Sequence, residues 1–503
     1  MTRNSGLLLH VSSLPGQYGI GTLGKDAYAF VDFLIESGQK VWQILPLGPV
    51  GFGNSPYQSY SAFAGSELLI DLELLVSDKL LERAELEVLL DFPAKKVAFE
   101  RLIPEKRNLL EKAYQRFKKS FDLFKDDYYT FLGEHAWWLN DYALFQALKD
   151  EQPEAAWNEW EDGYKKRDSH VLDVAHHEYS EVINYHRFVQ FIFFKQWFEL
   201  KSYANAGGVQ LFGDLPLYVA LDSADVWANQ DLFVLNEEGE PTHVGGVPPD
   251  YFSETGQLWG CPVFDWEQLA ERKYDWWIAR LHFCLNMFDL IRIDHFRGLE
   301  SFWAVDAAEE TAENGEWWPA KGMELLKLLR SQIGELPVVA EDLGIITPEV
   351  EQLRKAFDLP GMKVMQFAFA SDAENEHLPH NYESNFVVYT GTHDNDTTLG
   401  WLKSATKVEQ RNLKKYFGHN HSRAFVPVVE SAWASVARTA IMPMQDVLRL
   451  DSKGRMNVPG VAHGNWEWRF QWKQIRPAQR IFLKRMTEKY NRCWFATSSS
   501  DEG

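Results

Sequence analysis

LLLHVS (residues 7–12), DAYAFVDFLIES (residues 26–37) and VWQILPL (residues 41–47) follow one another near the start of the chain and decide its fold class. The first and third are short apolar runs, and the third stops at Gly48-Pro49, which predicts two strands. The middle segment has apolar residues at helical spacing and ends before Gly38, which predicts a helix. Strand, helix and strand in this order indicate βα units and a parallel sheet.

The same pattern continues along the chain. Six further apolar runs fit strands: Val209–Pro216, Leu290–His295, Val338–Asp342, Lys363–Phe369, Phe386–Thr390 and Thr439–Val447. A helical pattern at Tyr274–Met287 precedes one of them, and Thr347-Pro348 places a cap residue before a proline at the start of another helix. Eight parallel strands with interleaved helices predict an α/β fold, a closed (β/α)₈ barrel. An open, doubly wound sheet is the competing interpretation.

The chain has 503 residues, about twice what such a barrel needs. We therefore expect one elaborated barrel domain over residues 1–503, with large insertions around its C-terminal face. Residues 66–207 are predicted to form a mainly helical insertion, with helical stretches at Leu80–Leu90, Glu100–Phe117 and Tyr185–Tyr203. Residues 221–266 are rich in Gly, Pro and aromatic residues, which predicts a loop-rich insertion bordering the active site.

Composition narrows the choice of partners. The formal net charge is −21, and such a surface repels phosphate backbones and anionic membranes but leaves neutral sugars unaffected. Three scattered cysteines, Cys261, Cys284 and Cys493, suggest neither a disulfide framework nor a zinc site. The apolar run Leu7–Leu9 is too short for a signal peptide. We expect a reduced, cytoplasmic protein that binds no nucleic acid and enters no membrane.

The strand LIRIDHFR (residues 290–297) carries the first candidate for chemistry. Alternation along a strand puts Arg292 and Asp294 on one face. An arginine beneath the aspartate would favour the ionised carboxylate, which a covalent nucleophile requires. A purely structural Arg–Asp ion pair explains this segment equally well.

Three more strands end in acidic residues. PVVAEDLG (residues 337–344) ends in Glu341 and Asp342; an apolar setting would raise the pKa of Glu341 and suit a general acid, whereas Asp342 fits better as the N-cap of the following helix. YTGTHDND (residues 389–396) brings His393 and Asp394 nearest the strand end. FGDLP (residues 212–216) adds Asp214. Paired carboxylates of this kind are what glycoside chemistry needs.

Three of these segments together resemble the amylomaltase family, the 4-α-glucanotransferases or disproportionating enzymes of the α-amylase superfamily. They are RIDHFR (292–297), AEDLG (340–344) and GTHDND (391–396). The resemblance extends over nearly the whole chain through LHVSSLP (9–15), GNSPYQ (53–58), GVPPDYF (246–252), GQLWG (256–260), RMNVPG (455–460) and GNW (464–466).

The resemblance implies a retaining double displacement on α-1,4-glucans, with no metal or organic cofactor. Asp294 is implied as the nucleophile and Glu341 as the acid that then becomes the base. Asp394 is implied as the third carboxylate, which binds sugar hydroxyls and steadies the transition state.

The resemblance also implies the substrate-binding residues and the partners. Six residues would line the sugar site: Tyr57, Asp214, Trp259, Arg292, His295 and His393. The donor would be a maltooligosaccharide or a glucan derived from starch or glycogen, and the acceptor glucose or another glucan. A monomer or homodimer is expected.

Two positions depart from the family pattern, and two other functions remain open. Cys261-Pro-Val-Phe264 stands where Asn-Pro-x-Tyr is expected, and Val461 stands where Thr is expected, both in loops thought to border the acceptor side. An α-glucan hydrolase would use the same three carboxylates with water as the acceptor. A non-catalytic glucan-binding protein would use the same aromatic residues.

Overall fold

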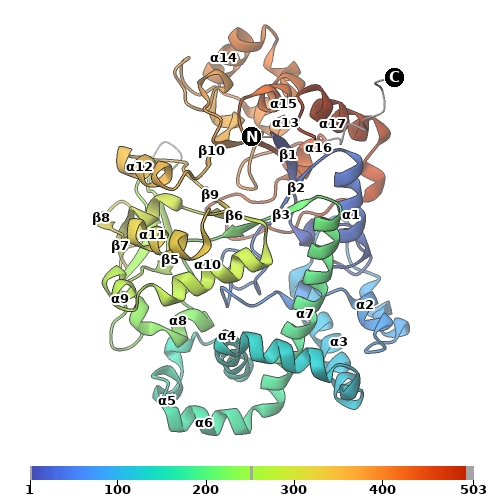
Figure 1. Cartoon of the computed structure of the whole chain (residues 1–503), viewed down its shortest axis with the longest axis vertical. Helices are drawn as coiled ribbons and strands as arrows, with labels where there is room; N and C mark the ends of the chain where they lie inside the picture. The colour runs from blue at the N-terminus through green and yellow to red at the C-terminus, as the bar shows by residue number, and fades with distance from the viewer. Residues whose placement is uncertain (1–2, 250–252, 494–503) are drawn as a thin grey trace.

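The computed structural model describes residues 3–249 and 253–493, and a barrel of eight parallel strands lies at its centre (Figure 1). The strands follow chain order around the barrel: β1 (Asn4–Leu8), β2 (Val41–Gln43), β3 (Gln210–Leu215), β6 (Leu290–Ile293), β9 (Val338–Ala340), β10 (Gly361–Val364), β11 (Phe386–Tyr389) and β12 (Thr439–Pro443). The Ala340 amide donates to the Pro360 carbonyl at 2.8 Å and joins β9 to the start of β10. The predicted closed barrel is confirmed, and the open, doubly wound sheet is wrong.

The observed strands are shorter than the predicted ones at their C-terminal ends. The Ile44 N–H still donates to the Phe212 carbonyl at 2.8 Å, but residues 44–47 lie past the end of β2, and Met444–Val447 form helix α16 instead of extending β12. The apolar pattern continues there because these residues are buried, although the chain has already left the barrel wall. Burial alone therefore does not mark where pairing stops.

Helices cover the outside of the barrel. They are α1 (Lys25–Glu36), α10 (Asp275–Met287), α11 (Gly322–Ile333), α12 (Pro348–Ala356), α13 (Thr398–Ser404), α14 (Lys407–Phe417), α15 (Phe425–Ala434), α16 (Met444–Val447) and α17 (Pro477–Lys489). In α1 one stripe of side chains, including Phe30 and Leu34, is buried, as amphipathic spacing requires. Helix α12 begins with Thr347 at its N-cap position and Pro348 in its first turn, as predicted, but the Thr347 side chain makes no capping hydrogen bond.

Between β2 and β3 the chain forms six helices, which occupy the lower part of the view in Figure 1. They are α2 (Leu72–Ser77), α3 (Phe99–Lys119), α4 (Lys125–Glu151), α5 (Asp162–Lys165), α6 (Ser169–Glu178) and α7 (Ser180–Ala206). Aromatic side chains join the long helices: the rings of Phe117 and Phe188 lie 4.8 Å apart, and those of Phe131 and Phe194 lie 5.6 Å apart. Much of the aromatic content of the chain therefore serves packing.

A second sheet lies beside the barrel. Its antiparallel strands run in the order β5 (Gln257–Pro262), β4 (His243–Val247), β7 (Ser301–Asp306) and β8 (Gly315–Pro319). Two short helices, α8 (Ala224–Ala228) and α9 (Trp266–Glu271), flank the first two strands in sequence. The sequence analysis expected mainly loop over residues 221–266 and did not predict this sheet.

The two ends of the chain meet where the barrel closes. Strand β1 pairs with β12 along its whole length. The buried side chain of Arg492 donates to the carbonyls of Asn4, Trp433 and Ser435 at 2.9, 2.7 and 3.0 Å. Among the helices of the described residues, none has the length and apolar character needed to cross a bilayer.

Candidate active site

The guanidinium of Arg292 joins carboxylates from two neighbouring strands. Residues 214 and 292 are direct partners in the pairing of β3 with β6. The Nε atom of Arg292 donates to Oδ1 of Asp214 at 2.9 Å, and Nη2 lies 2.9 Å from Oδ2 of Asp214 and 2.6 Å from Oδ1 of Asp294. The predicted contact between Arg292 and Asp294 is present, and the buried Asp214 shares the same cation.

Asp294 is held between opposing influences on its pKa. Together they raise the pKa to about 7: burial raises it most, the positive charge of Arg292 lowers it, and the charges of Asp214 and Asp394 raise it. The expected effect of Arg292 is therefore present, but burial outweighs it. The side chain still exposes 32% of its surface, so the carboxylate remains open to a ligand.

Glu341 follows β9, the neighbour of β6 in the barrel. Its Oε2 accepts the backbone N–H of His295 at 2.8 Å, and its Oε1 accepts that of Leu343 at 3.2 Å. Burial raises the pKa of Glu341 to about 8, and the nearby charge of Asp294 adds to the shift. Gly344 then turns the chain away with a φ of 89°, a conformation that favours glycine.

Asp342 points away from this pair. Its Oδ1 accepts the backbone N–H of Met362 at 2.6 Å, and its Oδ2 lies 3.1 Å from Nε of Arg354. Because α12 starts at Pro348, the interpretation of Asp342 as its N-cap is wrong. Asp342 instead ties the end of β9 to β10 and α12.

His295 connects the two carboxylates through its backbone. It adopts the left-handed conformation, with φ 53° and ψ 47°, which few residues other than glycine adopt. Burial, with a smaller contribution from Arg297, lowers the pKa of the imidazole to about 3, so the ring is neutral near pH 7. The ring meets Trp259 edge-on with centroids 4.7 Å apart. Strained backbone of this kind is typical of functional sites.

Tyr57 reaches the site from the loop after β2. Its hydroxyl donates to Oδ2 of Asp214 at 2.7 Å, and its ring stacks on His393 with centroids 5.2 Å apart and an interplanar angle of 12°. Trp466 lies against both rings, at 5.8 Å from Tyr57 and 5.9 Å from His393. Burial raises the pKa of Tyr57 well above its ordinary value, so the phenol stays protonated.

Asp394 faces the site from the loop after β11. Its Oδ1 accepts Nδ2 of Asn457 at 2.6 Å and lies 3.4 Å from Nε2 of His393. Its side chain exposes 45% of its surface. The neighbours in the motif serve the loop: Asn395 accepts the backbone N–H of Thr392, and Asp396 accepts the hydroxyl of Ser452.

The second sheet brings Trp259, on β5, to the same place. Trp259 is half-buried, and its Nε1 donates to Oε1 of Gln257 at 3.3 Å. Two positions further on, Cys261 is buried and accepts Nε2 of Gln58 at 3.5 Å. Val461, the other departure from the family pattern, is exposed. One departure therefore lies inside the packing around the Tyr57 loop, and the other lies on the surface.

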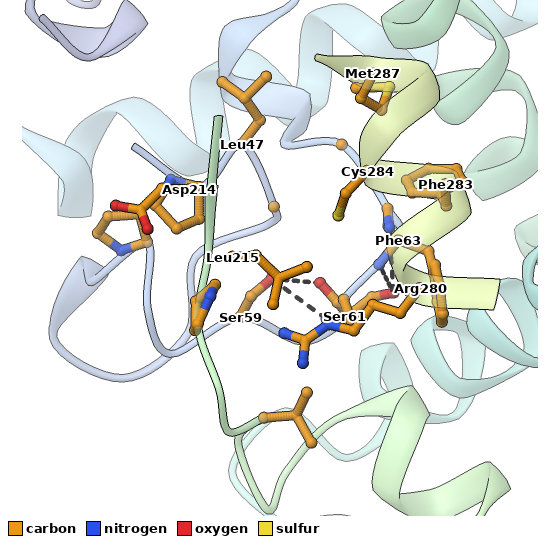
Figure 2. A pocket seen from close by; sticks show the side chains of 18 of the residues that line it. Leu47, Ser59, Ser61, Phe63, Asp214, Leu215, Arg280, Phe283, Cys284 and Met287 are labelled. Carbon is orange, nitrogen blue, oxygen red and sulfur yellow. Dashed lines mark hydrogen bonds between the residues drawn. The ribbon is translucent and has the colours of Figure 1, made fainter. Parts of the chain in front are cut away.

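A small cavity lies behind Asp214, between the 46–65 segment and α10 (Figure 2). Its volume is about 70 Å³, room for a few water molecules. Helix α10 lines it with Arg280, Phe283, Cys284 and Met287, which share one helical face (Figure 2). Asp214 also borders the cavity, so its packing continues from the site into the barrel wall.

Contacts connect all nine predicted site residues. His295 contacts both Trp259 and Glu341. Arg292 binds both Asp294 and Asp214. Tyr57 binds Asp214 and stacks on His393, which lies beside Asp394. Within residues 3–249 and 253–493, no group of three or more His, Cys, Asp or Glu side chains is arranged to hold a metal ion.

The sequence analysis missed Asn457 and Trp466 as site residues. Both lie in segments that carried the resemblance, RMNVPG and GNW, which was the available signal. Their contacts with Asp394 and with Tyr57 join parts of the chain far apart in sequence, which no local pattern indicates. Residues 250–252 of the GVPPDYF segment lie outside the described residues.

Fold and site together define a (β/α)₈ barrel with three partly open carboxylates at the C-terminal ends of its strands, the edge where such barrels place catalytic residues. The family model described as 4-alpha-glucanotransferase matches residues 9–474. The chain belongs to this family.

Named relatives agree over almost the full length. The chain is 47% identical to a 4-alpha-glucanotransferase of Synechocystis sp., covering 97% of this chain and 98% of the relative. It is also 47% identical to that of Thermus thermophilus, covering 98% and 99%. An amylomaltase structure from Streptococcus agalactiae, in complex with acarbose, is 40% identical, with a TM-score of 0.94 over 98% of this chain and 100% of that one.

Proposed function

We propose that the protein is a 4-α-glucanotransferase that moves a segment of an α-1,4-glucan to the 4-hydroxyl of an acceptor by a retaining double displacement. The observation that carries the proposal is the Asp294–Glu341 pair, joined through the amide of His295, in a chain that matches the family over nearly its full length. A raised pKa on each carboxyl group favours a shared proton, the starting condition for a nucleophile beside a general acid.

In the first step the carboxylate of Asp294 attacks the anomeric carbon of the donor sugar. The bond between that carbon and the bridging oxygen breaks, and Glu341 gives its proton to the departing oxygen. The products are a covalent ester on Asp294 and a shortened glucan with a free 4-hydroxyl. The Arg292 cation supports this step because it favours the ionised form of Asp294.

In the second step the acceptor replaces the departed glucan. Glu341, now ionised, takes the proton of the acceptor 4-hydroxyl. The hydroxyl oxygen of the acceptor attacks the anomeric carbon, and the ester bond to Asp294 breaks. Two inversions give net retention. Asp394, whose side chain is partly exposed, binds hydroxyls of the donor sugar, and Trp259 offers a partly exposed ring for stacking.

Maltotriose as the sole substrate tests this function. A transferase converts it into glucose, maltose and longer oligosaccharides, and chromatography of the products over time detects the longer ones. Shortened products alone would make the protein a hydrolase of the same superfamily.

Acceptor, assembly and location form a second part of the proposal. We propose that glucose and short glucans both serve as acceptors, that the protein is a monomer or homodimer, and that it works in the cytoplasm. Three free cysteines, one of them buried beside the site, support a reducing compartment. Incorporation of radiolabelled glucose into oligosaccharides tests the acceptor. Light scattering after size exclusion measures the oligomeric state, and cell fractionation tests the location.

A further inference from the structure

Asn457 makes a hydrogen bond to Asp394 that the reaction scheme above does not use. The Nδ2–Oδ1 distance is 2.6 Å, a short contact of the kind made with an ionised acceptor. Within the described part of the chain, no donor is bonded to the other oxygen, Oδ2, of Asp394. The contact therefore occupies one oxygen of Asp394 and leaves the second for a sugar hydroxyl.

The backbone around Asn457 is fixed to the same loop. Its N–H donates to the carbonyl of His393 at 3.2 Å. Arg455 donates from Nη2 to the carbonyl of Asp394 at 2.5 Å and from Nε to the carbonyl of Asn457 at 2.7 Å. The first two bonds join the two segments and the third holds Arg455 in place, so the backbone of Asn457 is fixed where its side-chain amide can reach Asp394.

The alternative support for Asp394 is weaker. His393 places Nε2 at 3.4 Å, beyond the usual range of a good hydrogen bond. Burial lowers the pKa of His393, so its ring is neutral near pH 7 and brings no charge to the contact. Asn457 is thus the main side chain that orients Asp394.

We propose that Asn457 is a positioning residue for transfer: it turns Asp394 toward the donor sugar and ties that carboxylate to the loop at residues 458–464, which contains Val461. The inference rests on the proposed function, because it gives the orientation of Asp394 a part in the reaction. The loop itself is closed by Asn465, which accepts the N–H of Val458 and donates to the carbonyl of Val461.

Asn457→Ala and Asn412→Ala form a matched pair, since both remove a side-chain amide that donates a hydrogen bond but only the first touches Asp394; Asn412, on α14, donates to the carbonyls of Phe369 and Ser371. For Asn457→Ala we expect kcat for maltotriose to fall about 10- to 100-fold, with KM within about threefold, because the lost bond acts on a charged group in the transition state. For Asn412→Ala we expect kcat within about threefold of wild type.

Asn457→Asp supplies a readout that a purely structural role would not move. When both carboxyl groups are ionised they repel each other, and Asp394 loses its donor. When the new carboxyl is protonated it donates to Asp394 and restores the bond, and closeness to Asp394 raises its pKa. Asp294, Tyr57, His393 and Arg455 also face Asp394, and all are common to the variants. The ratio of kcat for Asn457→Asp to kcat for Asn457→Ala should therefore rise as pH falls.

Three results would overturn the inference: wild-type kcat in Asn457→Ala, equal losses in the two alanine variants, or a ratio that does not change with pH. The maltotriose assay of the wild type is performed first. If the wild type transfers and Asn457→Ala matches it, this inference alone fails. If the wild type only hydrolyses, the proposed function fails, and the same variants are compared by their rates of hydrolysis.

Discussion

Asp294 offers the most direct test at the scale of single residues. Replacing it with Asn keeps the shape and removes the charge that attacks the anomeric carbon, so we expect transfer from maltotriose to fall by more than about 10⁴-fold. Asp396→Asn, in the loop after β11, is the matched control and should stay near wild type. Retained turnover in Asp294→Asn would rule out Asp294 as the nucleophile, whereas glucan binding without turnover in the wild type would make the protein a binding protein.

The raised pKa of Glu341 predicts how the activity depends on pH. The competent form carries a proton on Glu341, whose pKa is raised to about 8, so kcat/KM for maltotriose should fall above roughly pH 8. An α-maltosyl fluoride donor releases fluoride without an acid, so the same fall should be absent from its kcat/KM. Parallel pH profiles for the two donors would argue against Glu341 as the acid.

The same residue also links pH to stability. Its folded pKa is raised above the ordinary value of 4.5, so its contribution to folding is fully present below pH 4.5 and is lost as pH rises through about 8. Glu341→Gln removes that loss. We expect the variant to unfold at a higher temperature than wild type at pH 9 and to lose this advantage near pH 4.5. A constant difference across this range would contradict the prediction.

The strand-end carboxylates could be predicted from sequence, and Asn457 could not. Asp294, Glu341 and Asp394 each follow a recognisable strand, and strand ends meet at one edge of a barrel. The position of Asn457 depends on how the chain after β12 folds back over the loop after β11, with Arg455 as the link. That path is set by tertiary contacts, which leave no period in the sequence.

At the scale of elements, helix α14 shows how a local signal fixes a boundary. Thr406 accepts the N–H of Glu409, and Glu409 returns a bond to the N–H of Thr406, which forms a capping box. Thr406→Ala should reduce the stability of the first turn of this helix by about 1 kcal/mol. Hydrogen–deuterium exchange should become faster in the first turn of α14 and stay unchanged in α10, with normal transfer activity. Unchanged exchange would mean that packing alone holds this turn.

Strands were predicted more reliably in the barrel than in the second sheet. The eight parallel strands are almost entirely buried on both faces and mostly apolar, which gives short, clear runs such as Phe386–Tyr389. Strands β4 and β5 contain Gly245, Gly246 and Gly260, and glycine carries no strand preference. Gly246 is required there because a Cβ would come within 2.5 Å of the Gln257 carbonyl on the paired strand. The glycine that this strand pairing requires is therefore also a residue that does not indicate a strand in the sequence.

At the scale of the whole molecule, Arg492 holds the seam where the barrel closes. Arg492→Met removes the side-chain donor of the Asn4 and Trp433 carbonyls and leaves the Ser435 carbonyl with Arg3 alone, and we expect the apparent Tm to fall by about 3 °C or more. Arg485→Met, at an exposed position of α17, is the control and should leave the Tm unchanged. Equal stability of the two variants would show that strand pairing alone secures the seam.

The pairing of β1 with β12 also sets the order of events during synthesis. β1 leaves the ribosome first, yet one of its two partners spans Thr439–Pro443 and is translated only near the end of the chain. At about 5–20 residues per second, one edge of β1 waits for roughly 20–90 s. An unpaired edge strand is a template for any other extended chain nearby. The barrel therefore cannot close until β12 has been made, and we expect the open edge of β1 to need cover from a chaperone or from other parts of the nascent chain until then.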